Sequence, residues 1–461
     1  MLGRQLIPLL LMTSSCITVA GDDRDLPPGV DIRVLGVGSN AEPWSFAPAD
    51  EAGTRLPVGE RHDAALVGKW EERDTMWDDV ALLYSSKKGI QVWEGGGLLG
   101  HPLWSSGERE STLTDAAWSA DGSTLYAWLN TDEQLCAIDA RTAAVRSLTD
   151  LDRHINGWNP WHFWRHYDPN PESRPLGIVE DAKRHRLLML LDEEHNADVS
   201  FWQKRPGRGG CWLEAIDLET GESEALFDKE RMPELALRWD ISLERGRFFA
   251  LTLPKPVDEY QPGRAWRVEE RRLDGVLVSV FTGIDGLAGA LQLSPDGMQL
   301  IVERRYKPGT EIPSGGLDDL SRDQLHWLND QTHGGFVVID LDSGEILDGP
   351  HSGEQARWSP DGQHIAYVDG WDLIIGATTS RTLSRVIRGS PPADDWYYNT
   401  WLGPVWSSDG RRLAICAPNL DLTVLLDLER REYLILEGDY GAQLLWAPTP
   451  HPFGRKPGRS T

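Results

Sequence analysis

Two segments of this 461-residue chain place aromatic, histidine and acidic side chains close together. The first spans residues 158–168 and reads Trp-Asn-Pro-Trp-His-Phe-Trp-Arg-His-Tyr-Asp. The second spans residues 394–401 and reads Asp-Asp-Trp-Tyr-Tyr-Asn-Thr-Trp. Flat rings offer a large contact area at a low cost in side-chain entropy, and neighbouring acids and amides can fix polar groups. Such segments suit a sugar ring, a peptide side chain or the surface of a partner protein.

The candidate ligand-binding residues come from these two segments and from two further long loops. They are Trp158, Trp161, His162, Trp164, His166, Trp202, Trp327, Trp396, Tyr397 and Trp401. The alternative is that the rings pack on one another, because long loops need a small core of their own. In that case the loops only stabilise a structural protein.

A metal site is conceivable in the first segment. His162 and His166 would share one face of a helix, with Asp168 nearby. Pro160 and Pro169 bracket the segment, and no Glu follows the first His as it does in metalloprotease helices. We therefore expect neither a metal nor a cofactor.

Complete catalytic motifs are missing from the sequence. It contains no Gly-x-Ser-x-Gly elbow and no phosphate-binding glycine loop of the nucleotide type. Acids are plentiful, so a carboxylate pair for glycoside chemistry stays an alternative, although no pair is singled out. We accordingly name no catalytic residue.

The elements that must position these loops carry a repeated turn. It occurs four times, at residues 118–122, 293–297, 358–362 and 406–410, with the pattern Trp/Leu-Ser-x-Asp-Gly. Ser and Asp-Gly fit a type I turn with a left-handed glycine, as in β-hairpins. Two weaker copies occur at 179–183 and 241–246. Each copy precedes an apolar run, so each is predicted to join two antiparallel strands.

A second repeated element follows further along each unit. It is an apolar strand that ends in an aspartate and a turn, at Asp139, Asp217, Asp340 and Asp427. The repeat therefore contains four strands, which is the size of a β-propeller blade. Because a single blade cannot bury both of its faces, the units must stack around an axis.

Six complete units and two fragments are predicted. The units are 114–150, 175–230, 236–283, 286–350, 353–389 and 402–438. Residues 78–104 lack a first strand, and residues 441–448 resemble a first strand alone. We predict an all-β propeller of seven four-stranded blades, closed by strands from both ends of the chain. An alternative is an eighth blade donated by residues 21–77.

One copy of the repeat carries a family resemblance. Residues 358–367 read Trp-Ser-Pro-Asp-Gly-x-x-Ile-Ala-Tyr and resemble the propeller repeats of TolB and, more loosely, WD-type repeats. The resemblance covers residues 78–448 and implies the propeller fold. It implies no activity, because such propellers host binding proteins, scaffolds and appendages of hydrolases. The α/β N-terminal domain of TolB has no obvious counterpart here, so no TolB-like role is carried over.

The blade plan places nearly all long insertions on one face. Three lie between second and third strands, at 192–210, 254–265 and 306–334, and two lie between blades, at 150–175 and 389–402. Both classes of connection open on the same side of the ring. Function concentrates on loops that a rigid scaffold holds, so we expect binding there.

Composition limits the possible partners. The formal net charge of −26 repels phosphate backbones, so nucleic acid is not an expected partner. The four cysteines include Cys16, and the remaining odd number argues against a disulfide framework. We expect Cys136 and Cys416 to be buried small apolar residues. The protein is expected to be a monomer.

The N-terminus has the pattern of an export signal. Arg4 precedes a short apolar run, and Thr13-Ser-Ser-Cys16 resembles a bacterial lipobox, with Thr13 where an aliphatic residue is usual. Cys16 would then be lipidated; the alternative is cleavage after Ala20. The chain is predicted to contain a signal peptide (1–20), a Pro/Gly-rich arm (21–77), a propeller (78–448) and a flexible tail (449–461).

These observations converge on one expectation. The chain is predicted to be an exported, lipid-anchored propeller of the periplasm or cell envelope, which touches the membrane through Cys16 alone. Its loop-rich face is predicted to bind a protein, a peptide or a glycan as a binding or scaffold module. The alternative is a propeller hydrolase or lyase that acts on glycans or peptides at the mouth of the central funnel.

Overall fold

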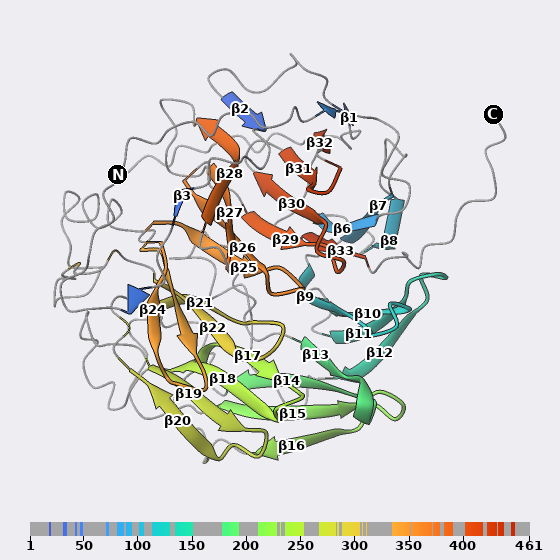
Figure 1. Cartoon of the computed structure of the whole chain (residues 1–461). Coiled ribbons are helices and arrows are strands. Elements are labelled where there is room, and N and C mark those ends of the chain that lie inside the picture. Colours follow the sequence, from blue (N-terminus) through green and yellow to red (C-terminus); the bar gives the residue numbers. More distant parts are fainter. Residues whose placement is uncertain are drawn as a thin grey trace, which may run out of the picture.

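A computed structural model gives the arrangement of the strands (Figure 1). The description covers residues 81–86, 89–94, 101–105, 113–129, 134–150, 178–192, 211–227, 236–252, 267–282, 288–304, 334–350, 352–370, 372–378, 382–390, 402–417, 422–430, 432–437 and 444–447, short stretches at 18–19, 31–34, 42–43, 47–48 and 71–72, and residues 231, 284, 307 and 310.

Six blades each contain four consecutive antiparallel strands, and each matches one of the predicted units. Blade 1 contains β9 (Leu113–Trp118), β10 (Thr124–Leu129), β11 (Gln134–Asp139) and β12 (Val145–Asp150). Blade 2 contains β13 (Ile178–Asp181), the 3₁₀ turn η2 (Ala182–Arg184), β14 (Arg186–Asp192), β15 (Cys211–Asp217) and β16 (Ser223–Phe227). Blade 3 contains β17 (Ala236–Ser242), β18 (Arg247–Thr252), β19 (Arg267–Arg272) and β20 (Leu277–Phe281).

The second half of the chain forms the other three. Blade 4 contains β21 (Ala288–Leu293), β22 (Gln299–Arg304), β23 (Phe336–Asp340) and β24 (Ile346–Asp348). Blade 5 contains β25 (Glu354–Trp358), β26 (His364–Asp369), β27 (Asp372–Ala377) and β28 (Thr382–Ser390). Blade 6 contains β29 (Leu402–Trp406), β30 (Arg412–Ala417), β31 (Leu422–Asp427) and β32 (Glu432–Glu437). The predicted all-β propeller with four-stranded blades is confirmed.

A further four-stranded sheet, here called the closing sheet, joins distant parts of the chain. Its order is β33 (Leu444–Trp446), β6 (Ala81–Ser86), β7 (Gly89–Glu94) and β8 (His101–Ser105). The register places Leu444 opposite Tyr84 and Trp446 opposite Leu82. The sequence predicts seven blades, and this count is corrected to six. Six blades are built from consecutive strands, whereas the two predicted fragments pair with each other in the separate closing sheet.

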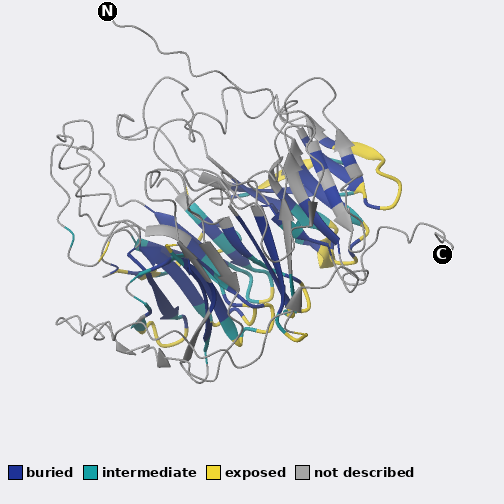
Figure 2. Ribbon diagram, turned by 90° about the horizontal axis from the view of Figure 1, so that it is seen from above, coloured by how far each residue is buried: buried dark blue, intermediate teal, exposed yellow. Residues whose placement is uncertain are grey.

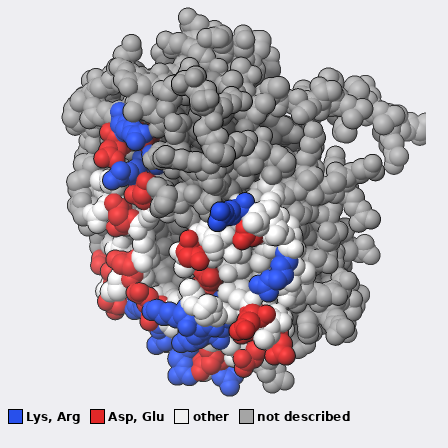
Figure 3. Space-filling view, turned by 90° about the vertical axis from the view of Figure 1, so that its right-hand side faces the viewer, with Lys and Arg blue, Asp and Glu red and all other residues white. Residues whose placement is uncertain are grey.

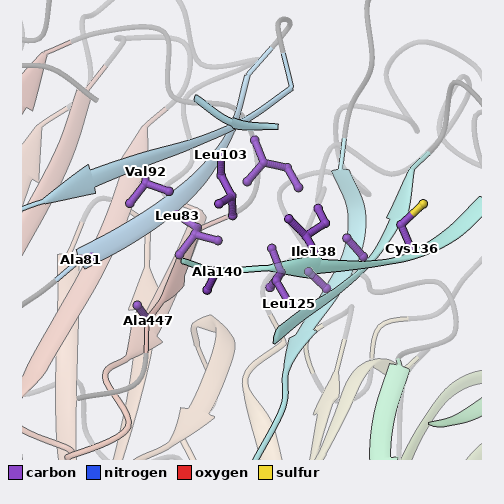
Figure 4. Packing of buried hydrophobic residues seen from close by; sticks show 12 residues of the cluster. Ala81, Leu83, Val92, Leu103, Leu125, Cys136, Ile138, Ala140 and Ala447 are labelled. Atoms are coloured by element: carbon purple, nitrogen blue, oxygen red, sulfur yellow. The ribbon is translucent and has the colours of Figure 1, made fainter. Parts of the chain in front are cut away.

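The closing sheet packs on both of its neighbours. Toward blade 1, Leu83 and Val92 join one buried cluster with Leu125 and Ile138 (Figure 4). Toward blade 6, the indole Nε1–H of Trp446 donates to the carbonyl oxygen of Val405, with 2.9 Å between the nitrogen and the oxygen. The closing sheet therefore lies between blade 1 and blade 6 and contacts both.

The repeated turn is held by the same hydrogen bonds in all four strong copies. In blade 5, the buried Ser359 hydroxyl donates to the Asp361 carboxylate at 2.5 Å and accepts from the N–H of His364 at 2.9 Å. Gly362 has a φ of 69°, which glycine adopts without steric cost. The copies that begin at Ser119, Ser294 and Ser407 repeat this pattern. The turn chemistry predicted from the sequence is confirmed.

The aspartates that end the third strands close a second set of turns. Asp340 accepts hydrogen bonds from the backbone N–H and the hydroxyl of Ser343, each at 2.8 Å. These two bonds, the backbone one first, lower the pKa of the Asp340 carboxyl below its ordinary value. Asp139 and Asp217 bond in the same way to the threonines that follow them.

Short strands from the N-terminal part of the chain pair with the outer strands of three blades. β1 (Thr18–Val19) and β5 (Glu71–Glu72) pair with β32, β2 (Asp31–Val34) and β3 (Glu42–Pro43) pair with β28, and β4 (Ala47–Pro48) pairs with β24. Among the described strands these segments extend existing sheets, and they form no eighth sheet of their own.

Leucines of matched size test the role of the closing sheet. Leu83→Ala is expected to lower the free energy of unfolding by about 2–5 kcal/mol, since Leu83 is 1% exposed between two sheets. Leu277→Ala is the control, because Leu277 is 46% exposed and its loss should cost less than about 0.5 kcal/mol. Urea unfolding of both variants measures the difference, and equal losses would contradict a structural role for the closing sheet.

Candidate functional site

All ten predicted ligand-binding residues lie outside the described part of the chain, and so does Cys16. The ten are Trp158, Trp161, His162, Trp164, His166, Trp202, Trp327, Trp396, Tyr397 and Trp401. Their roles stay predictions. The described strands nevertheless establish where the loops that carry them begin and end.

The ends of the strands define two unlike faces. The first-to-second and third-to-fourth turns are short and lie on one side, here called the turn face. The opposite side, here called the loop-rich face, receives residues 193–210, 253–266 and 305–335 between second and third strands. It also receives residues 151–177 and 391–401 between blades. Most exposed turns gather along one side of the ring in Figure 2.

A group of buried and half-buried polar residues lies where blades 4 and 5 meet the loop-rich face. We call it the mouth cluster. Glu303 and Arg304 are the last two residues of β22. Glu354, Gln355 and Arg357 belong to β25. Both strand ends belong to the loop-rich face, since β22 ends at the 305–335 connection and β25 begins after a blade connection.

Glu303 links the two blades within this cluster. Its Oε1 accepts a hydrogen bond from the backbone N–H of Ala356 at 2.5 Å. The guanidinium Nη1 of Arg357 lies 3.7 Å from the same oxygen. Burial raises the pKa of the Glu303 carboxyl above its usual value, and the negative charge of Glu354 acts in the same direction, against the opposing effect of Arg357. The carboxyl therefore holds a proton more readily than a free glutamic acid.

The backbone beside Glu303 is irregular. The pairing of β25 with β26 shifts register between Glu354 and Arg357, and the buried Gln355 has a φ of 59°. A positive φ is uncommon for a residue with a side chain and persists only where the surroundings impose it. Register shifts occur toward the same end of β17, β21 and β29. Bulges of this kind are frequent next to functional sites, where they redirect side chains.

A further polar contact lies near the mouth cluster. Nearby, the Ser352 hydroxyl donates to the Asp369 carboxylate at 3.1 Å, on the same face of blade 5. Within the described ranges, no group of three His, Cys, Asp or Glu residues could hold a metal ion. Among the described elements no helix is both long and apolar enough to cross a membrane.

Sequence reasoning did not single out Glu303. A signal was present, because Glu303-Arg304-Arg305 directly follows the apolar run Leu300-Ile-Val302 and precedes a long insertion. Charged residues at the end of an otherwise buried strand indicate a polar contact with a neighbour. The identity of that neighbour, blade 5, required the tertiary structure.

Comparison with known proteins finds likeness in solved structures alone. No family model matches the sequence, and no curated protein does. A candidate 6-phosphogluconolactonase from Bacteroides uniformis is 13% identical over 80% of this chain and 99% of its own, with a TM-score of 0.45. TolB from Acinetobacter baumannii is 11% identical over 81% of this chain and 68% of its own, with a TM-score of 0.40. A protein of unknown function from Desulfotomaculum acetoxidans is 11% identical, with coverages of 80% and 99% and a TM-score of 0.47.

TolB, whose repeats residues 358–367 resemble, is thus among the solved structures that this chain is similar to. With identities of 11–13% and TM-scores of 0.40–0.47, these three matches carry no argument about what this chain binds.

Glu303→Gln tests the electrostatics of the mouth cluster. Because the pKa of Glu303 is raised in the folded state, its carboxyl contributes most to the stability of the wild type below the unfolded-state pKa, near 4.5. This contribution to stability is lost as the pH rises through the folded-state pKa. The variant should therefore be the more stable protein at pH 8, and the gap should close as the pH falls toward 4. Urea unfolding across this range measures it. The exposed Glu345→Gln variant is the control. A stability difference between Glu303→Gln and the wild type that does not change with pH would contradict a raised pKa of Glu303.

Proposed function

We propose that this chain is an exported, lipid-anchored propeller that binds a protein, a peptide or a glycan through its loop-rich face. It acts as a binding or scaffold module. The proposal rests on the aromatic composition of the long loops together with their common position on one side of a rigid ring.

The observation that supports it most strongly is the contrast between the two faces. On the turn face, the hydrogen bonds of Ser359, Asp361 and their counterparts hold short hairpins in place. On the other face, insertions such as 305–335 and 151–177 are far longer than a strand connection needs. A ring with one closed and one elaborated face presents a defined surface for recognition.

We further propose that the closing sheet completes the ring. This is supported by the β33–β6 pairing and by the contacts that the sheet makes with blades 1 and 6. A closed ring has no open sheet face that would need another partner. It therefore supports the expectation of a monomer.

Export and anchoring rest on the N-terminal sequence. The basic residue, the short apolar run and Thr13-Ser-Ser-Cys16 are typical of a lipoprotein signal. The proposal places the protein in the periplasm or the cell envelope, with the membrane contacted through the lipid on Cys16. Cleavage after Ala20 would instead release it.

An enzyme acting on glycans or peptides is the second candidate. The buried Glu303 carboxyl on the loop-rich side of blades 4 and 5 favours it, because burial raises the pKa of this group. A carboxyl that retains a proton can donate it to a leaving group. Binding is the first proposal because it rests on the aromatic loops and on the contrast between the two faces.

Alanine at Trp161 and Trp401 together tests the binding proposal. The full-length protein is used to capture partners from an envelope extract and is applied to a glycan array. We expect the double variant to lose at least about tenfold in affinity for whatever the wild type retains, because aromatic anchors dominate such contacts.

The matched control is Val145→Ala with Met298→Ala. These residues are 44% and 38% exposed and belong to turn-face segments. Capture that is unchanged in the tryptophan variant, or lost equally in the control, would count against recognition through the loop-rich face.

Cys16→Ser tests the anchor separately. The wild type is expected to enter the detergent phase and the variant the aqueous phase, since removing a thiol that carries lipid removes the anchor. Metabolic labelling with a fatty acid provides the direct readout. An aqueous, unlabelled wild type cleaved after Ala20 would contradict anchoring and leave the binding proposal intact.

A further inference from the structure

The outer strand of blade 3 carries an unusual group of exposed apolar side chains. The described part of the chain has six exposed large apolar residues. Four of them belong to this strand or directly precede it. They are Val276, Leu277, Val278 and Val280, with exposures of 38%, 46%, 46% and 40%. Exposed apolar residues grouped in this way indicate an interaction site.

The same strand has a free edge. β20 pairs with β19 on its inner side, and no described strand pairs with its outer side. The outer strands of blades 4, 5 and 6 differ, because the N-terminal strands β1 to β5 extend them. Figure 1 places β20 on the rim, next along the ring after β24. Among the described strands, the outer row of backbone N–H and C=O groups on β20 therefore has no partner strand.

Other uncovered outer strands carry the residues that protect an edge. β8 contains Pro102, β12 contains Arg146 and Asp150, and β16 contains Glu224. Proline and charged side chains on an edge oppose the addition of another strand. The segment Val276–Phe281 contains neither, and its single polar residue is Ser279. β20 thus lacks the protection that the comparable edges have.

We propose that β20 is a docking edge for an extended apolar segment of another polypeptide, flanked by basic residues, which adds a strand to blade 3. Main-chain hydrogen bonds supply the affinity in such strand addition, and alternate side chains supply the specificity. The molecule already uses this mode of contact, since β2 and β4 add to β28 and β24 in the same way.

Charge selects this occupant over a second copy of the chain. Each copy has a formal net charge of −26, so two copies repel each other, whereas a basic segment is attracted. Close to β20 the signs are mixed, as in the Arg272–Asp274 ion pair. Figure 3 likewise shows both signs on the side of the ring that it presents. The attraction therefore comes from the overall charge, and binding should weaken as salt increases.

The test uses the full-length protein and a labelled peptide, Lys-Lys-Val-Thr-Val-Thr-Val-Lys-Lys, in a fluorescence anisotropy titration. A peptide with proline in place of its first and third valines is the negative probe, since proline cannot donate a main-chain hydrogen bond. Val278→Lys and Val280→Lys each place a charge on the edge. Val145→Lys, on the outer strand of blade 1 with 44% exposure, is the matched control.

We expect the wild type and Val145→Lys to bind the valine peptide, and the two edge variants to bind it about tenfold more weakly or worse. Backbone hydrogen exchange in the wild type should slow at residues 277–281 when the peptide is present, which needs no variant to fold. Trp161→Ala with Trp401→Ala should bind the peptide normally, so this inference and the binding proposal can fail independently.

Three results would overturn the inference. The first is equal binding by the edge variants and the wild type, or by the two peptides. The second is the absence of slowed exchange at residues 277–281. The third is a concentration-dependent dimer that Val278→Lys abolishes, without peptide binding, which would assign the edge to a second copy of the chain.

Discussion

The fold depends on covering both faces of every blade. Successive residues of a strand point to opposite faces of the sheet, and here neighbouring residues are buried in different interfaces. Ile301 belongs to a cluster shared with blade 5, whereas Val302 belongs to one shared with blade 3. In blade 2, Leu187 packs toward blade 1 and Leu188 toward blade 3. Among the described residues, buried clusters lie between successive blades and between blade 1 and the closing sheet, whose strand β33 pairs with β6.

The same constraint explains why polar side chains form ion pairs in some parts of the ring and hold hairpins in others. Within β19, the buried Glu269 carboxylate forms ion pairs with Arg267 and Arg271. On the turn face, serine and aspartate side chains satisfy the backbone groups of each hairpin, so the strands keep their alignment. With the strands held from one side, loops of different length can be attached on the other side without disturbing the core. The elaborated face is thus a consequence of how the ring is stabilised.

The two proposed interaction surfaces use different parts of this frame. The proposed binding surface on the loop-rich face depends on the aromatic residues of the long loops. At the junction of blades 4 and 5, a carboxyl has a pKa that is raised by burial. The rim offers the main chain of β20 and the apolar side chains beside it. As proposed, recognition on the face uses side chains, whereas pairing on the rim uses the main chain, so the two depend on different groups of the ring.

The sequence by itself determined the features that involve near neighbours. A Ser-x-Asp-Gly turn is held by bonds between residues that are two to five positions apart, so its chemistry appears in the residue order and identifies the hairpins and the four-strand repeat. The role of Glu303 was hidden for the opposite reason. Its partner Ala356 lies 53 positions away, and their contact exists only because two blades pack side by side. Which rim edges are covered is decided in the same way, since it depends on where distant N-terminal strands lie against β24, β28 and β32. Local hydrogen bonds are encoded in short patterns, whereas contacts between blades arise from packing that no short pattern records.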